Sequence, residues 1–283
     1  MKLHRPLLPL IAAGCVAAFP CAAQDLAAKG RELFKKHQAS VVTVQLVVKT
    51  KMGVAGITGL PGGGGDARES KEEVTGTVID PSGLTVVALS STDPAGLFQG
   101  MMSSFGELGG DGEENVQFKM ETEVADVKLL GHDGTEMPAE IVLRDKDLDL
   151  AFVRPKTKPA APMPALDLSN SAKVDVLDEV IAINRLGKVA GRTHAAAVER
   201  INAVVKKPRL FYVPGSGATM TGLGCPAFTP DGKLVGVVVM RSIKSGGGGG
   251  MFSMQGGITA IILPADDVKK IAAQAPAVKE GTK

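Results

Sequence analysis

The side chains in this sequence that could carry out acyl-transfer chemistry are a thiol, several hydroxyls and a carboxylate that directly precedes an apolar run. Cys225 lies in the Gly-rich stretch GLGCPAFTPDGKLVGVVVM of residues 222–240, Ser216 lies just before it, and Asp149 precedes the LAFV run of residues 150–153. Attack on a carbonyl needs such a nucleophile, a base hydrogen-bonded to it, a carboxylate that orients the base, and backbone N–H donors for the oxyanion. The sequence therefore holds several parts of such a site.

The elements that would position these residues are mostly strands, because β-branched and apolar runs alternate with turn dipeptides. Turns are expected at Asp80–Gly83, Asp133-Gly134 and Asp231-Gly232, each between two apolar runs. Strands are predicted in the ranges 40–48, 74–91, 124–155, 175–184, 187–198, 200–205, 234–239 and 256–264. Short amphipathic helices are predicted over 25–38 and 265–274.

The order of these motifs resembles the protease domain of trypsin-like serine proteases of the HtrA (Deg) type. The resemblance is carried by the helix before SVVTV, by VTGTVID at 74–80, by the HDG turn, by DLAFV at 149–153 and by the 222–240 hairpin. It covers roughly residues 26–275 and leaves no segment for a PDZ domain. It implies an all-β, trypsin-like double β-barrel: two six-stranded antiparallel barrels with short N-terminal and C-terminal helices.

By this resemblance, the three triad positions can be assigned by counting from the turns. Counting from Gly83 puts the catalytic His slot on Ser90, and the Asp slot falls on Asp149. Superposing the Asp231-Gly232 turn puts the nucleophile slot on Leu223. Leu has no heteroatom to attack with, and a Ser hydroxyl cannot act as a general base near neutral pH. The resemblance therefore implies a degenerate catalytic triad.

The loop that would form the oxyanion hole comprises Thr221, Gly222 and Gly224. Thr221 stands where the family has its first Gly, and Cys225 stands where it has the second Gly after the nucleophile. The backbone of this corner therefore also departs from the family pattern.

Two residues, Cys225 and Ser216, could supply a nucleophile in place of Leu223, but a non-catalytic role is favoured for each. Cys225 is a nucleophile in principle, but it lies two residues late and precedes a Pro, so a buried and inert thiol is expected. Ser216 would serve only with a seven-residue insertion before the hairpin. Asp149 itself is expected to be retained for structure. None of the four His occupies the base slot, and surface positions are expected for them: His4, His37, His132 and His194.

The N-terminus has the pattern of a secretory signal peptide over residues 1–23, with a basic start, an apolar run and small residues before Gln24. Lipidation at Cys15 is the alternative. The chain has 32 Lys and Arg against 30 Asp and Glu; loss of Lys2 and Arg5 with the signal would leave 30 against 30. No nucleic-acid partner is expected of such a balance, and no later segment is long and apolar enough for a membrane span.

The expected organisation places the N-terminal helix and first barrel at 24–155, with an inserted loop at 92–123. This insertion is either loosely packed or a partner-gripping loop built on Met101, Met102 and Phe105. A Pro-rich linker at 156–164 then leads to the second barrel and C-terminal helix at 165–275 and a tail at 276–283.

The function expected from these observations is that of an exported HtrA-type homologue without proteolytic activity. Its expected partners are peptides, unfolded protein segments or a partner protease, and the resemblance leaves a homo-oligomer open. The alternatives are an active endopeptidase with a non-standard nucleophile and base, and a structural envelope protein. No cofactor and no metal are expected, because no His pair has metal-ligand spacing and no Gly-rich loop has phosphate-binding form.

Overall fold

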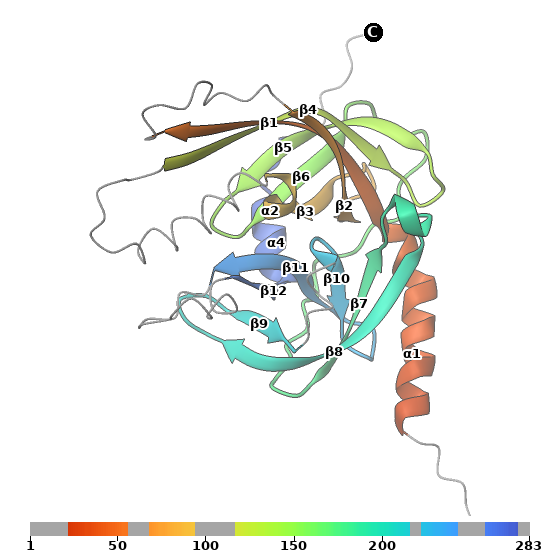
Figure 1. Cartoon of the computed structure of the whole chain (residues 1–283). Coiled ribbons are helices and arrows are strands. Elements are labelled where there is room, and N and C mark those ends of the chain that lie inside the picture. The colour runs from red at the N-terminus through yellow and green to blue at the C-terminus, as the bar shows by residue number, and fades with distance from the viewer. Residues whose placement is uncertain (1–21, 56–67, 94–116, 216–221, 243–257, 277–283) are drawn as a thin grey trace, which may run out of the picture.

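The computed structural model describes residues 22–55, 68–93, 117–215, 222–242 and 258–276. Within these residues the strands form two closed barrels of six strands each, one above the other in Figure 1. The strand orders are β1-β2-β3-β6-β5-β4 and β10-β11-β12-β9-β8-β7, and every pairing is antiparallel. The predicted all-β double barrel is confirmed.

The first barrel follows helix α1 and ends before the Pro-rich segment. Its strands are β1 (Val41–Ala55), β2 (Arg68–Val78), β3 (Thr85–Ala88), β4 (Gln117–Leu130), β5 (Glu136–Asp145) and β6 (Leu150–Pro155). Three short helical elements accompany it: α1 (Ala22–His37), η1 (Gln38–Ser40) and α2 (Leu89–Thr92).

The second barrel begins after residue 178 and is closed by a C-terminal helix. Its strands are β7 (Glu179–Arg185), β8 (His194–Val205), β9 (Phe211–Pro214), β10 (Pro226–Phe228), β11 (Leu234–Ser242) and β12 (Ile258–Pro264). The turn η2 (Lys188–Ala190) joins β7 to β8, and α4 (Ala265–Ala272) packs on β11 and β12.

Strands β1, β2 and β4 extend further than the sequence predicts. β1 continues to Ala55 instead of ending at residue 48, and β2 begins at Arg68, six residues before the predicted strand range of 74–91. β4 begins at Gln117, so the end of the predicted 92–123 insertion is a strand. These extensions are rich in charged residues, and backbone pairing of β1 with β2 and with β4 holds them. Hydrophobic alternation therefore does not reveal them.

The apolar core has three parts. One cluster fills the first barrel and includes Leu46 and Leu129, and another fills the second barrel and includes Tyr212 and Ile262. The third cluster draws residues from both barrels and both terminal helices, and Phe152 is among its buried members. Each fully buried aliphatic or aromatic side chain stabilises the fold by about 1.5–3 kcal/mol. The shared cluster therefore joins the two barrels.

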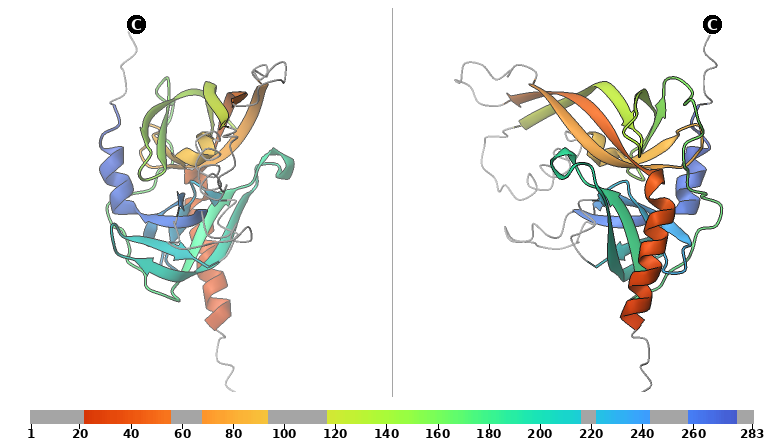
Figure 2. Two further views of the ribbon diagram at one scale, coloured as in Figure 1. Left: turned by 60° about the vertical axis from the view of Figure 1, so that its left-hand side comes forward. Right: turned by 90° about the vertical axis from the view of Figure 1, so that its right-hand side faces the viewer.

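Helix α1 runs along the side of the second barrel and then leads into β1 of the first (Figures 1 and 2). Within residues 25–37 of the helix the buried residue is Leu33, with Leu26 and Phe34 packed beside it against the shared cluster. No helix among the described residues is long and apolar enough to cross a membrane.

Candidate functional site

The structure brings together two of the three positions that the resemblance assigned to the triad. Ser90 lies in the one-turn helix α2, directly after β3, and Asp149 directly precedes β6, which pairs with β3. Asp149 Oδ1 accepts a hydrogen bond from the Ser90 N–H (2.6 Å), and Oδ2 accepts one from the Ser90 hydroxyl (2.9 Å). Oδ2 also accepts from the N–H of Met240 on β11 (2.7 Å). One carboxylate thus ties the first barrel to the second.

The Asp149 carboxylate is part-buried and accepts hydrogen bonds from three donors. Burial raises its pKa, and the hydrogen bonds from Met240 and Ser90 act in the opposite direction. The residue adopts φ +58°, a left-handed backbone conformation that Asp and Asn tolerate better than most residues. No histidine among the described residues hydrogen-bonds to it, so the carboxylate has no imidazole to orient.

The Gly-rich corner is fixed by backbone contacts on both sides. The Gly224 N–H donates to Val238 of β11 (2.7 Å), and the Gly224 carbonyl accepts from the Thr77 hydroxyl of β2 (2.7 Å). Gly224 has φ +85°, and a Cβ there would lie 2.2 Å from the Thr75 carbonyl oxygen. This position therefore requires Gly, because the corner lies directly against the first barrel.

Leu223, which the resemblance assigns to the nucleophile slot, is partly buried and packs against both the shared cluster and the core of the second barrel. A side chain in that environment is an apolar contact, with no atom able to attack or donate. Gly222 precedes it, and its carbonyl accepts the Cys225 N–H (3.0 Å), which closes a tight turn. Thr221 and Ser216 lie outside the described residues.

The thiol of Cys225 is 1% exposed. Burial raises its pKa to about 12, so at neutral pH it is almost wholly protonated. The thiolate is the attacking form of cysteine, and its fraction at pH 7 would be on the order of one in a hundred thousand.

A comparison with protein-family models agrees with the double-barrel fold. The model of the family described as "Trypsin-like peptidase domain" matches residues 74–237, which is more than half of the chain. This chain belongs to the trypsin-like peptidase domain family. The matched segment contains Ser90, Asp149 and Leu223. No curated protein matches the sequence.

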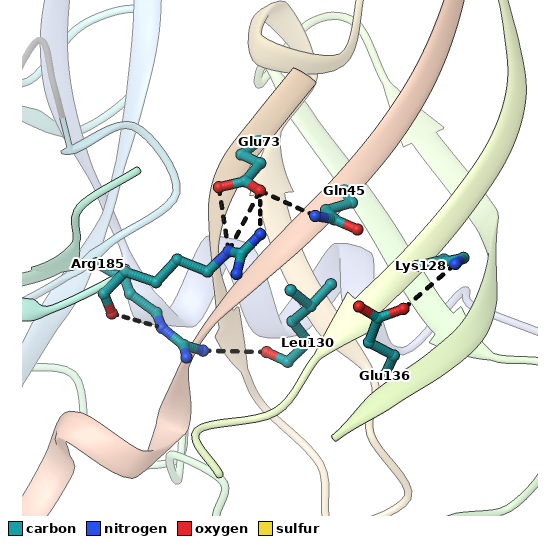
Figure 3. Close-up of polar contacts among 7 residues, drawn as sticks. Gln45, Glu73, Lys128, Leu130, Glu136 and Arg185 are labelled. Atoms are coloured by element: carbon teal, nitrogen blue, oxygen red, sulfur yellow. Dashed lines mark hydrogen bonds and ion pairs between the residues drawn. The ribbon is translucent and has the colours of Figure 1, made fainter. Parts of the chain in front are cut away.

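In this trypsin-like peptidase domain the β7–β8 hairpin is clamped to the first barrel by two arginines (Figure 3). Arg192 pairs with Glu73 of β2 through Nε and Nη2, at 2.6–3.2 Å, and Gln45 of β1 donates to the same carboxylate. The guanidinium of Arg192 is the main cause that lowers the pKa of Glu73. Arg185 Nη1 donates to the carbonyls of Leu130 (3.1 Å) and of the following glycine (2.8 Å).

Sequence reasoning missed this clamp, because its partners lie far apart in the chain and leave no local pattern. It also predicted surface positions for His37 and His194, and that prediction is wrong for both. His37 stacks on Phe228 with ring centroids 4.8 Å apart, and His194 Nε2 hydrogen-bonds the Val41 carbonyl (2.8 Å). Both imidazoles are half-buried because α1 and the β7–β8 hairpin lie against barrel strands.

Among the described residues, no group of three or more His, Cys, Asp or Glu could hold a metal ion.

Proposed function

We propose that this trypsin-like homologue has lost peptidase activity and acts by binding peptides, unfolded protein segments or a partner protease. The observation that carries the proposal is the Asp149 carboxylate, whose oxygens are taken by Ser90 and Met240 where a protease holds its catalytic base. A Ser hydroxyl that donates to a carboxylate cannot in turn accept a proton from a nucleophile near neutral pH.

The apolar nucleophile slot supports the same proposal. Removal of any one triad member from a serine protease lowers kcat by about 10⁴-fold or more. Here Leu223 replaces the attacking oxygen and Ser90 replaces the base, and the nearby Cys225 thiol is buried. No remaining described group near Asp149 supplies both functions.

The retained architecture supports binding. Both barrels, their shared core and the Gly224 corner are present, and we propose that a partner binds in the cleft of the ancestral protease. The HtrA-type resemblance extends the proposal to unfolded protein segments as partners. We further propose export through the signal peptide at 1–23, which lies outside the described residues but for its last two positions, with lipid anchoring at Cys15 as the alternative.

Cleavage and binding of one substrate test the proposal together. Purified protein is incubated with labelled, unfolded casein beside an intact HtrA-type protease, and turnover is followed by fluorescence while binding is followed by anisotropy. We expect binding without turnover, unchanged in Cys225→Ala and Ser216→Ala variants. Turnover that disappears in either variant would make the protein an active endopeptidase with a non-standard nucleophile. Absence of both turnover and binding would favour a structural role.

A further inference from the structure

The contact between α1 and the second barrel ends in an aromatic stack. His37 is the last residue of α1, and its ring lies nearly parallel to that of Phe228 on β10, at an interplanar angle of 19°. Earlier turns of the helix pack against the barrel through Leu33 and through Gly30, where a Cβ would lie 3.6 Å from Ile181. The stack therefore lies at the C-terminal end of α1, where the chain continues into η1 and β1.

The imidazole of His37 has an unusual environment for a polar group. Its Nε2 atom is buried and has no hydrogen-bond partner among the residues that the structure describes. In a neutral imidazole this nitrogen can be the unprotonated one, and an acceptor without a donor costs a moderate amount of free energy. Protonation would place an N–H there with no acceptor and would bury a positive charge, and each of these opposes docking.

The surrounding charges do not offset that cost. Burial lowers the pKa of His37, and Lys36 on α1 itself, with the same sign as an imidazolium, lowers it further. On β10 the facing residue is Phe228. The carbonyl end of α1 favours positive charge, but it offers no acceptor to Nε2.

Three carboxylates on or near the neighbouring elements form ion pairs of their own. In the β10–β11 turn, Asp231 pairs with Lys233. On β7, Glu179 pairs with Arg200. Within α1, Asp25 pairs with Lys29. The causes that shift the pKa of His37 are its burial and Lys36, and no carboxylate is among them.

We propose that the docking of α1 on the second barrel is an acid-sensitive latch, in which protonation of His37 loosens the helix. The undocked helix exposes His37 to water, where its pKa returns to about 6.5. Between that value and the lower docked value the undocked form binds more protons, so docking is favoured at neutral pH and weakens as the pH falls. The undocked population grows by at most about tenfold per pH unit in this window. Loosening uncovers Phe228 and the apolar face of α1.

Hydrogen exchange of the full chain at pH 7.5, 6.5 and 5.5 tests the latch. After correction for intrinsic rates, we expect protection of the α1 amides to fall up to about tenfold from pH 6.5 to 5.5, while β11 amides keep theirs. His37→Phe keeps an aromatic stack and removes the titration, so it should abolish the acid response. His194→Gln, at the other half-buried imidazole, should retain it.

Two outcomes overturn the proposal. One is a wild-type α1 whose protection does not change with pH, and the other is an acid response that persists in His37→Phe. If that variant fails to fold, a titration of the wild-type His37 ring by NMR decides the matter. A His37 pKa at or above 6.5 would contradict the latch, and a lower value would support it.

Discussion

Replacement of Asp149 by Asn would perturb the carboxylate that joins the two barrels without changing its shape. Asn also tolerates the left-handed backbone at this position, so the substitution adds no backbone strain. An amide has one accepting oxygen where the carboxylate has two. Its NH₂ group must face either the Ser90 N–H or the Met240 N–H, and both of these are donors.

In Asp149→Asn, one part-buried backbone N–H is therefore left without an acceptor, whichever way the new amide is turned. An unsatisfied buried donor costs about 1–3 kcal/mol, so we expect the free energy of unfolding to fall by that amount. Ser90→Ala is the matched control, because it removes one hydroxyl and leaves both N–H donors paired. Its expected cost is about 0.5–1.5 kcal/mol.

Equilibrium unfolding in urea at pH 7.4 measures both variants. Because burial raises the folded-state pKa of Asp149, the wild type binds more protons folded than unfolded between about pH 4 and that pKa. Its stability from this group is thus largest at low pH and declines as the pH rises, and Asp149→Asn should lack this component. Refutation would come from Asp149→Asn matching the wild type, or from Ser90→Ala being the more damaging change.

Three further predictions concern the corner, the clamp and the thiol. Gly224→Ala should lower the free energy of unfolding by about 3 kcal/mol or more, because the new Cβ overlaps the first barrel and φ is positive. Gly232→Ala, with φ +86° and open space around it, should cost only about 1 kcal/mol. Equal shifts in Tm for the two variants would contradict this. The side chains of Glu73 and Arg192 are 16% and 26% exposed, so a double-mutant cycle on the free energy of unfolding should give a coupling of about 1 kcal/mol that weakens in high salt. Zero coupling at low salt would count against the clamp. The Cys225 thiol should resist a thiol reagent at pH 7.5 until the protein is unfolded, and rapid native-state reaction would contradict its burial.

Turns were the features most directly predictable from the sequence. The Asp133-Gly134 and Asp231-Gly232 dipeptides both form the turns expected of them, with positive φ at each Gly. These positions need a backbone conformation that few residues adopt, so the residue type itself carries the signal. Together with the apolar runs between them, they predict strands, and the resemblance to trypsin-like proteases implies the double barrel.

The polar contacts between barrels were not predictable in the same way. The bond from Arg185 to the Leu130 carbonyl spans 55 residues, and that from Met240 to Asp149 spans 91. Such bonds depend on how two barrels dock, and no local periodicity encodes that. The buried face of His37 was hidden for the same reason, because a short amphipathic helix does not show which barrel residue its last turn will meet.

The proposed loss of catalytic chemistry is tested most directly by intact-mass measurement after incubation with a serine-directed fluorophosphonate and, separately, a thiol-directed probe. An intact HtrA-type protease serves as the positive control, and the protein is kept folded throughout. We predict no adduct on the native protein with either probe, because Leu223 offers no nucleophile and Cys225 is buried. A stoichiometric adduct that disappears in Ser216→Ala or Cys225→Ala would contradict the account and identify a working nucleophile.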